Sequence, residues 1–244
     1  MAGRNQLRIG ILRADAVLPE LAVDFGEYPE MFAALLAEVD PELAFAQFDV
    51  ENGPVPGSPL ECDGWLITGS RRSVYDDLPW ISRLSDFVGE MVELRRPLFA
   101  VCFGHQLVAQ ALGGLTERSS LGWTVGTQVH TIEEPFPWAL TGPREIRLLH
   151  SHRDQVARLP PGAKRVGGSA SCSLGFYRIG DHVMSCQGHP EFSTEYARAL
   201  YDLRRDALGE EVWQRAEASL AEPNDRLEVA RWASRFFRHA RQAR

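Results

Sequence analysis

Strand-type and helix-type segments alternate through the first half of this 244-residue chain. The expected strands cover residues 7–12, 43–48, 65–68 and 97–101, and the expected helices cover 28–39, 80–94 and 103–112. Such alternation is typical of crossover units, which build a parallel sheet with helices on both faces. We therefore predict an α/β fold with three layers and a mostly parallel central sheet.

The second half of the chain has a different pattern. Residues 122–187 contain apolar runs separated by turn residues, which indicates shorter strands. From Ser193 onward the spacing of apolar residues is helical, and Ser193 or Thr194 can cap the first helix. The expected helices of this tail are 195–208, 210–220 and 225–241, with Glu195, Arg198, Arg204 and Arg205 on a solvated face. We expect a catalytic domain over 1–192 and a helical extension over 193–244 packed on it.

Charge and composition argue against several classes of function. The formal net charge of −7 disfavours a surface that follows nucleic-acid phosphates. No apolar run approaches the ~20 residues of a membrane span. Lys164 is the only lysine and is not part of a Gly-Lys-Ser/Thr segment, which argues against a P-loop ATPase and against a lysine Schiff base elsewhere.

The cysteine pattern indicates free thiols. Residues 1–6 are polar and lack the features of a signal peptide, so we expect a cytoplasmic protein. The four cysteines, at 62, 102, 172 and 186, are expected to be reduced there, and none has C-x-x-C spacing. His150 and His152 could share a strand face, but with no third ligand nearby we prefer a role in a turn to a metal site.

One cysteine stands at a strand-to-helix junction. Cys102 directly follows the expected strand 97–101, and the small residue Gly104 precedes the body of the next helix. A tight turn of this kind lifts a nucleophile above the edge of a sheet. The helix N-terminus favours the thiolate, and the N–H of Phe103 is placed to stabilise an oxyanion. A buried structural cysteine is the alternative, but this context favours a nucleophile.

A second segment supplies a base for that nucleophile. His189 and Glu191 flank Pro190 after the expected strand 183–187. The proline ends the strand, so both side chains can project from the same strand end. A carboxylate beside the imidazole fixes its tautomer and stabilises its cation, as in other nucleophile–histidine–acid triads.

These segments resemble the class I, or triad-type, glutamine amidotransferases, most of all the stand-alone relatives of the GMP synthase glutaminase domain. The matching segments are 68–70, 101–106, 122–123, 151–156 and 188–191. The resemblance implies a flavodoxin-like sheet and no cofactor. It also implies hydrolysis of the glutamine side-chain amide through a cysteine γ-glutamyl thioester. The ammonia released would pass to a separate synthetase subunit that activates an acceptor.

The resemblance also implies a role for each site residue. Cys102 would attack the amide carbon, His189 would protonate the leaving ammonia and then activate water, and Glu191 would orient His189. The backbone N–H groups of Ser70 and Phe103 would bind the oxyanion. The implied substrate-binding residues are Gly69, Gln106, Ser151, His152 and Arg153.

Two positions depart from the family pattern. Ala100 and Ser70 stand where glycine is usual. Alanine at position 100 is expected to cause only a slight adjustment. If the backbone at Ser70 required a positive φ, a residue with a side chain would cost about 1 kcal/mol there.

Other functions remain open at this point. Segments 104–106, 153–156 and 187–191 also resemble plant-type gamma-glutamyl peptidases, which cut γ-glutamyl bonds in glutathione-like compounds. A non-catalytic binding protein on the same fold is a third possibility, which the complete set of Cys, His and Glu disfavours. His105, Arg71 and Arg72 could line the pocket or lie in solvent.

Overall fold

The computed structural model describes residues 6–242 and confirms the alternation expected for the first half. Its elements there are β1 (Leu7–Arg13), α1 (Pro19–Phe25), α2 (Tyr28–Val39), β2 (Leu43–Asp49), β3 (Gly64–Ile67), α3 (Pro79–Glu93), β4 (Leu98–Val101) and α4 (Phe103–Ala111). Only α1 was not expected. Helices α1, α2 and α3 each carry a proline in their first turn, where the missing N–H has no intrahelical partner to lose.

The second half completes the sheet. Its strands are β5 (Leu115–Arg118), β6 (Thr124–Ile132), β7 (Glu145–His152), β8 (Asp154–Arg158), β9 (Ala163–Gly168), β10 (Phe176–Ile179) and β11 (Val183–Cys186). The expectation of short strands is wrong for β6 and β7, which have 9 and 8 residues. They pair with each other along almost their whole length, and the long ladder satisfies the facing N–H and C=O groups of both strands.

One large mixed sheet organises the molecule. Nine strands follow the order β2-β1-β3-β4-β11-β10-β9-β6-β7, and β5 pairs with β8 separately. Neighbours from β2 to β11 are parallel, whereas the strands beyond β11 are antiparallel. The predicted α/β architecture is therefore confirmed, and its parallel part contains the predicted nucleophile strand, β4.

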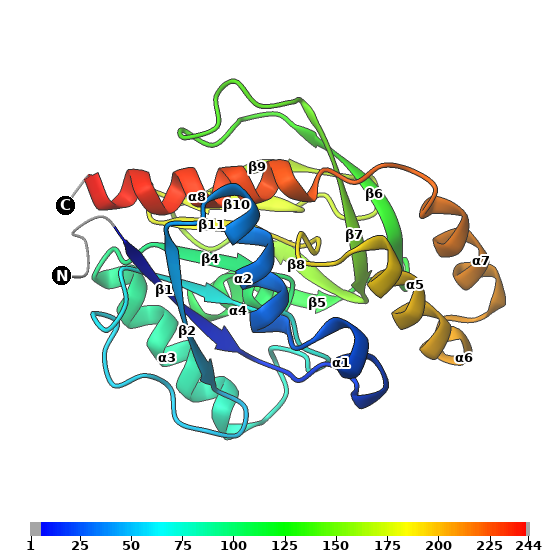
Figure 1. Cartoon of the computed structure of the whole chain (residues 1–244), viewed down its shortest axis with the longest axis horizontal. Helices are drawn as coiled ribbons and strands as arrows, with labels where there is room; N and C mark the ends of the chain where they lie inside the picture. The colour runs from blue at the N-terminus through cyan, green and yellow to red at the C-terminus, as the bar shows by residue number, and fades with distance from the viewer. Residues whose placement is uncertain (1–5, 243–244) are drawn as a thin grey trace.

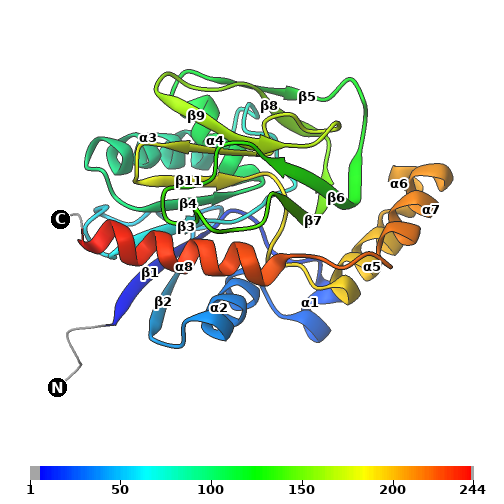
Figure 2. The ribbon, with the colours of Figure 1, turned by 90° about the horizontal axis from the view of Figure 1, so that it is seen from above.

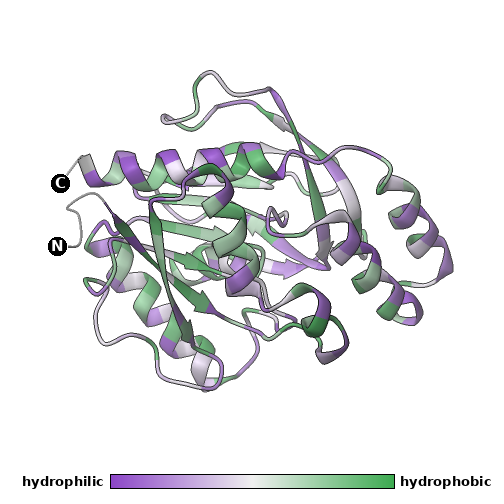
Figure 3. Ribbon diagram, viewed as in Figure 1, coloured by the Kyte–Doolittle hydropathy of each residue, from purple (hydrophilic) through white to green (hydrophobic). Residues whose placement is uncertain are grey.

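Helices cover both faces of the parallel strands. Leu66, Phe99 and Val101 pack in one apolar cluster with α2 and α8, whereas Trp65 and Ile67 pack in another with α3 and α4. Figure 2 shows α2 and α8 on one side of the sheet and α3 and α4 on the other. The central strands are hydrophobic along their length (Figure 3), because successive side chains enter opposite cores.

The tail is helical, as expected, but one of its helices is interrupted. It contains α5 (Thr194–Leu203), α6 (Arg205–Leu208), α7 (Glu210–Ser219) and α8 (Arg226–Gln242). Ser193 caps α5, with its side chain accepting a hydrogen bond from the Tyr196 N–H at 3.1 Å. The expected helix 195–208 instead breaks at Arg204. Helices α5 to α7 gather at one end of the molecule, and α8 returns along the sheet (Figure 1).

All four cysteines are free, as expected, and all four are buried. Within the described residues no helix is long and apolar enough to cross a membrane. The polar segment 1–6 lies, apart from Gln6, outside the described residues.

Candidate active site

Three neighbouring parallel strands bring the expected catalytic segments together. Strands β3, β4 and β11 are adjacent in the sheet and run in the same direction. Their carboxyl ends therefore meet at one edge, where open α/β sheets place their ligand sites. Gly69 and Ser70 follow β3, Cys102 follows β4, and His189 follows β11.

Cys102 has a strained backbone at the junction between β4 and α4. Its φ is +50° and its ψ is −102°, a backbone conformation that residues other than glycine rarely adopt. The turn is held because the Cys102 N–H donates to the Cys186 carbonyl at 3.0 Å. Gly104 lets α4 approach β3, since a Cβ there would lie 2.8 Å from the Ile67 carbonyl oxygen. Sγ is thereby presented at the N-terminus of α4.

The His189 ring is fixed from two sides. Its Nδ1 hydrogen-bonds Glu191 Oε1 at 2.7 Å, and its ring stacks on Phe192 with centroids 4.0 Å apart. Its ring also lies close enough to Cys102 for the sulfur to raise the pKa of the imidazole. With the proton of Nδ1 on the Glu191 side, Nε2 is the nitrogen left for the sulfur and the substrate.

The charge state of His189 follows from these partners. Burial opposes protonation, but the negative charge of Glu191 and the Cys102 sulfur together raise the pKa of His189 to about 10. Glu191 is itself buried, and its Oε2 has no hydrogen-bond partner among the described residues, so its charge acts mainly on the imidazole. The raised pKa favours the imidazolium form of His189 beside Cys102.

Two backbone N–H groups flank Cys102. Among the described residues, neither the N–H of Ser70 nor that of Phe103 donates to a partner. The Phe103 group begins α4 and so has no intrahelical acceptor. Ser70 does not have a positive φ, so the strain considered from the sequence does not arise. Gly69 lies close to His189, because a Cβ on it would be 3.0 Å from His189 Cε1.

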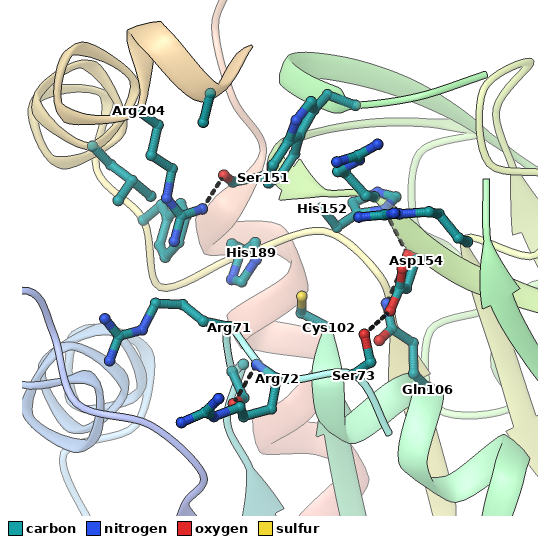
Figure 4. A pocket seen from close by; sticks show the side chains of 18 of the residues that line it. Arg71, Arg72, Ser73, Cys102, Gln106, Ser151, His152, Asp154, His189 and Arg204 are labelled. Atoms are coloured by element: carbon teal, nitrogen blue, oxygen red, sulfur yellow. Dashed lines mark hydrogen bonds between the residues drawn. The ribbon is translucent and has the colours of Figure 1, made fainter. Parts of the chain in front are cut away.

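A pocket of about 340 Å³ opens over these groups. Cys102, His189 and all five of the expected substrate-binding residues line it. Glu191 and Phe103 are not part of the lining: Glu191 is behind His189, and Phe103 can contribute only through its backbone. Arg71 and Arg72 line the pocket, whereas His105 does not. Figure 4 shows Cys102 at the centre, between two walls of different character.

One wall is built around Gln106 and Asp154. Gln106 Nε2 donates to the Asp154 carbonyl at 2.7 Å and to Gln187 Oε1 at 3.1 Å. These bonds use both amide protons, so Oε1 is the part of Gln106 that remains available to a ligand. Ser73 Oγ donates to Asp154 Oδ2 and links the β3 loop to this wall.

A separate contact joins Arg204 to β7. The Ser151 hydroxyl accepts a hydrogen bond from Arg204 Nη1 at 2.7 Å.

Three buried histidines form a chain behind the same wall. His130 Nε2 lies 2.8 Å from His150 Nε2, His150 Nδ1 lies 3.0 Å from His152 Nε2, and His152 Nδ1 lies 2.9 Å from the Asp154 carbonyl oxygen. That oxygen can only accept, so His152 Nδ1, His150 Nδ1 and His130 Nε2 each carry the proton. The expectation that His150 and His152 act in a turn is wrong, because both lie on β7.

Burial keeps these histidines neutral. It lowers the pKa of His152 to about 3 and that of His130 to about 4, and it lowers the pKa of His150 well below the ordinary value. His105 is buried too, with its pKa lowered to about 3 and its Nδ1 at 2.5 Å from Ser185 Oγ. Both suggestions for His105, pocket and solvent, are therefore wrong.

We expect His150→Phe to weaken substrate binding. The variant keeps the volume but removes two hydrogen bonds, and each buried group left unpaired costs about 1–3 kcal/mol. His152 and the Asp154 carbonyl would then no longer hold Gln106 firmly, so KM should rise more than kcat falls. Steady-state kinetics and urea unfolding measure both effects. His182→Phe is the control, since the buried ring nitrogens of His182 make no hydrogen bond in the described structure. An unchanged KM in His150→Phe would contradict this role.

The sequence did not indicate two residues that shape the site. Asp15, just after β1, accepts from the Arg71 N–H at 2.7 Å and from its guanidinium at 2.8 and 2.9 Å. Asp15 follows a strand whose carboxyl end lies at the same edge of the sheet as Cys102, and this position in the sequence could have indicated a role in the site. Arg204 was expected on a solvated helix face, but the break after α5 turns it into the pocket. No local pattern indicates that break.

Comparison with known proteins identifies the family. The model of the class-I glutamine amidotransferases, "Glutamine amidotransferase class-I", matches residues 21–201. The chain belongs to this family. Its resemblance to the family, drawn from the motifs around Cys102 and His189, is thereby confirmed.

Relatives within this family differ in their described activities. "Gamma-glutamyl peptidase 4" from Arabidopsis thaliana is 30% identical over 186 residues, which is 73% of this chain and 72% of that protein. A glutamine-hydrolyzing GMP synthase subunit from Archaeoglobus fulgidus is 28% identical over 180 residues, or 73% of this chain and 91% of that one. The crystal structure of a glutamine amidotransferase from Thermotoga maritima superposes with a TM-score of 0.74 at 18% identity, covering 97% and 98% of the two chains. That last likeness concerns the fold.

Proposed function

We propose that this chain hydrolyses the amide bond of glutamine or a related γ-glutamyl amide through a cysteine γ-glutamyl thioester. The placement of Cys102 beside His189 in one pocket, with His189 Nδ1 hydrogen-bonded to Glu191, is the observation that carries this proposal. Membership of the amidotransferase family supports it.

The first half-reaction forms the thioester. Cys102 Sγ attacks the δ-carbonyl carbon, and the resulting oxyanion accepts from the Ser70 and Phe103 N–H groups. The C–N bond then breaks as His189 Nε2 gives its proton to the leaving nitrogen. Ammonia, or an amine, departs, and the acyl group remains on sulfur.

The second half-reaction releases glutamate. His189, now neutral, takes a proton from water, whose oxygen attacks the thioester carbon. The C–S bond breaks, and the thiolate and imidazolium are restored together. Glu191 keeps the His189 ring in one orientation through both halves. Gly69, Gln106, Ser151, His152 and Arg153 surround the γ-glutamyl group in this proposal.

The fate of the nitrogen separates two versions of this function. In the first, ammonia passes to a separate synthetase subunit, and the likeness to the Archaeoglobus GMP synthase protein supports this version. In the second, the chain is a free-standing gamma-glutamyl peptidase. The likeness to gamma-glutamyl peptidase 4 favours it, and so does a pocket of about 340 Å³ that is lined on both sides of Cys102. In either version we propose a cytoplasmic enzyme with residues 1–192 as its catalytic domain.

An assay of released glutamate tests the proposal. The purified protein is incubated separately with glutamine, glutathione and simple γ-glutamyl amides, and glutamate and ammonia are quantified. We expect glutamate from at least one of them, in wild type but not in Cys102→Ala. If wild type releases none, and Cys102→Ala binds these compounds as wild type does, the chain is a non-catalytic binding protein and the proposal fails.

A further inference from the structure

The pocket is strongly basic, although the chain as a whole carries a formal charge of −7. Five arginines line it, at positions 71, 72, 118, 153 and 204, against a single carboxylate, that of Asp154. Arg71 is neutralised by Asp15, with which it forms a paired set of hydrogen bonds. Within the described residues none of the other four arginines has a carboxylate within 4 Å. An excess of positive charge therefore faces the ligand space.

The charges are unevenly divided between the two walls. In Figure 4, Gln106, Ser73 and Asp154 lie on one side of Cys102, and Arg71, Arg72 and Arg204 lie on the other. His189 stands between Cys102 and the arginine wall in that view. The two sides of a γ-glutamyl bond are chemically distinct, so each wall can be assigned to one half of the substrate.

The wall with Asp154 suits the γ-glutamyl half of a substrate. The α-ammonium group of that half needs an acceptor, and Asp154 supplies the only carboxylate in the lining. Its α-carboxylate has Arg153 nearby, whose Nε is buried and without a hydrogen-bond partner in the described structure. Arg153 lies over the Trp123 ring, with its guanidinium carbon 5.4 Å from the ring centroid, and this contact limits its movement.

The arginine wall then faces the leaving group. His189 protonates the leaving nitrogen, and whatever that nitrogen carries extends past His189 toward Arg72 and Arg204. Arg204 is held by Ser151 Oγ at 2.7 Å through one N–H, which leaves others free for a ligand. A guanidinium in this setting binds carboxylates through paired, charge-assisted hydrogen bonds.

We propose that the substrate is a γ-glutamyl conjugate with an acidic leaving group, an amine that itself carries carboxylates, recognised by Arg72 and Arg204. The inference rests on the proposed function. When the C–N bond breaks, the proton from His189 goes to the leaving nitrogen, and the carboxylates leave unchanged with the amine. Glutamine, whose leaving group is ammonia, uses neither arginine and is the poorer substrate.

Paired substrates that differ by one charge test this directly. γ-Glutamyl-glutamate and γ-glutamyl-glutamine have nearly the same shape, but the leaving group of the second has one negative charge fewer. We expect kcat/KM to be about tenfold higher for the glutamate compound, the value of one charged hydrogen-bonded contact, and glutamine to be hydrolysed more slowly than both. The preference should shrink when salt is raised from about 0.05 to about 0.5 M, because exposed charges are screened.

Variants of Arg72 and Arg204 test whether these two residues cause the preference for the glutamate compound. Arg72→Gln and Arg204→Gln should each reduce the ratio of the two kcat/KM values several-fold, and together should bring it near one. Arg198→Gln, on α5 and paired with Glu217 outside the pocket, removes the same charge and should leave the ratio unchanged.

The outcomes separate this inference from the proposed function. Equal hydrolysis of the two dipeptides, whatever the rate with glutamine, or a preference that persists in the double variant, overturns the acidic leaving group while the hydrolase remains. No hydrolysis of any γ-glutamyl compound by wild type overturns the proposed function itself.

Discussion

Cys102→Ala is expected to lower the turnover of every γ-glutamyl substrate by about 10⁴-fold or more, the loss typical of removing a covalent nucleophile. Without Sγ no thioester can form, and the Ser70 and Phe103 N–H groups have no tetrahedral intermediate to stabilise. Substrate binding should persist, because the pocket walls are built by other residues. Steady-state kinetics and calorimetric titration with the same compound measure the two effects.

The control for that variant is Cys62→Ala. Cys62 is equally buried but packs against the core around Trp65, outside the pocket lining. It should cost stability and leave kcat within a few-fold of wild type. If Cys102→Ala retained more than one-hundredth of wild-type turnover, the covalent mechanism would be wrong.

The second large expected effect is a fall in the free energy of unfolding at acidic pH. His105, His130, His150 and His152 are buried and neutral, with pKa values that burial lowers to about 3 for His105 and His152 and to about 4 for His130. In the unfolded chain a histidine titrates near a pH of about 6.5. Between that pH and about 4 the unfolded chain therefore binds protons that the folded chain does not. Each such histidine lowers the free energy of unfolding by about 1.4 kcal/mol per pH unit as the pH falls.

Because all four groups act in the same direction, the free energy of unfolding should fall steeply below pH 6. His189 changes the stability at alkaline rather than acidic pH. Its raised pKa, about 10, stabilises the fold fully below pH 6.5, and this contribution is lost as the pH rises toward 10. Stability should therefore be greatest near neutral pH.

Urea unfolding at pH 7, 6 and 5 measures this dependence. We expect a steep fall in the free energy of unfolding, and a slope about 1.4 kcal/mol per pH unit smaller in His105→Asn. His239→Gln, which alters a histidine outside the buried set, should follow wild type. A free energy of unfolding that is flat between pH 7 and pH 5 would contradict the neutral, buried state of these four histidines.

Local patterns in the sequence predicted the fold class and the residues nearest the chemistry. The junction at Cys102 is readable because strand, nucleophile, glycine and helix follow one another directly. His189 and Glu191 are two residues apart, so their hydrogen bond needs no distant partner. The strained φ of Cys102 is the conformation that such a junction requires.

The rest of the site depends on pairings that no local pattern reveals. His130 on β6 meets His150 on β7 although the register of the two strands places it opposite Ile146, so spacing along one strand could not reveal the contact. Asp15 and Arg71 are 56 positions apart, and Arg204 and Ser151 are 53 apart. Arg204 reaches the pocket because α5 ends one residue earlier, and its spacing on a continuous helix predicted the solvated face instead. These contacts give the pocket its charge, so the sequence indicated the reaction better than its substrate.

Labelling of Cys102 tests the central claim most directly. Wild type is treated with a glutamine-like electrophile, and the modified cysteines are identified by mass spectrometry of peptides. We expect Cys102 to react far faster than Cys62, Cys172 and Cys186, and an excess of a γ-glutamyl substrate to protect it. Equal labelling of all four thiols, or labelling that substrate does not slow, would contradict a nucleophilic Cys102.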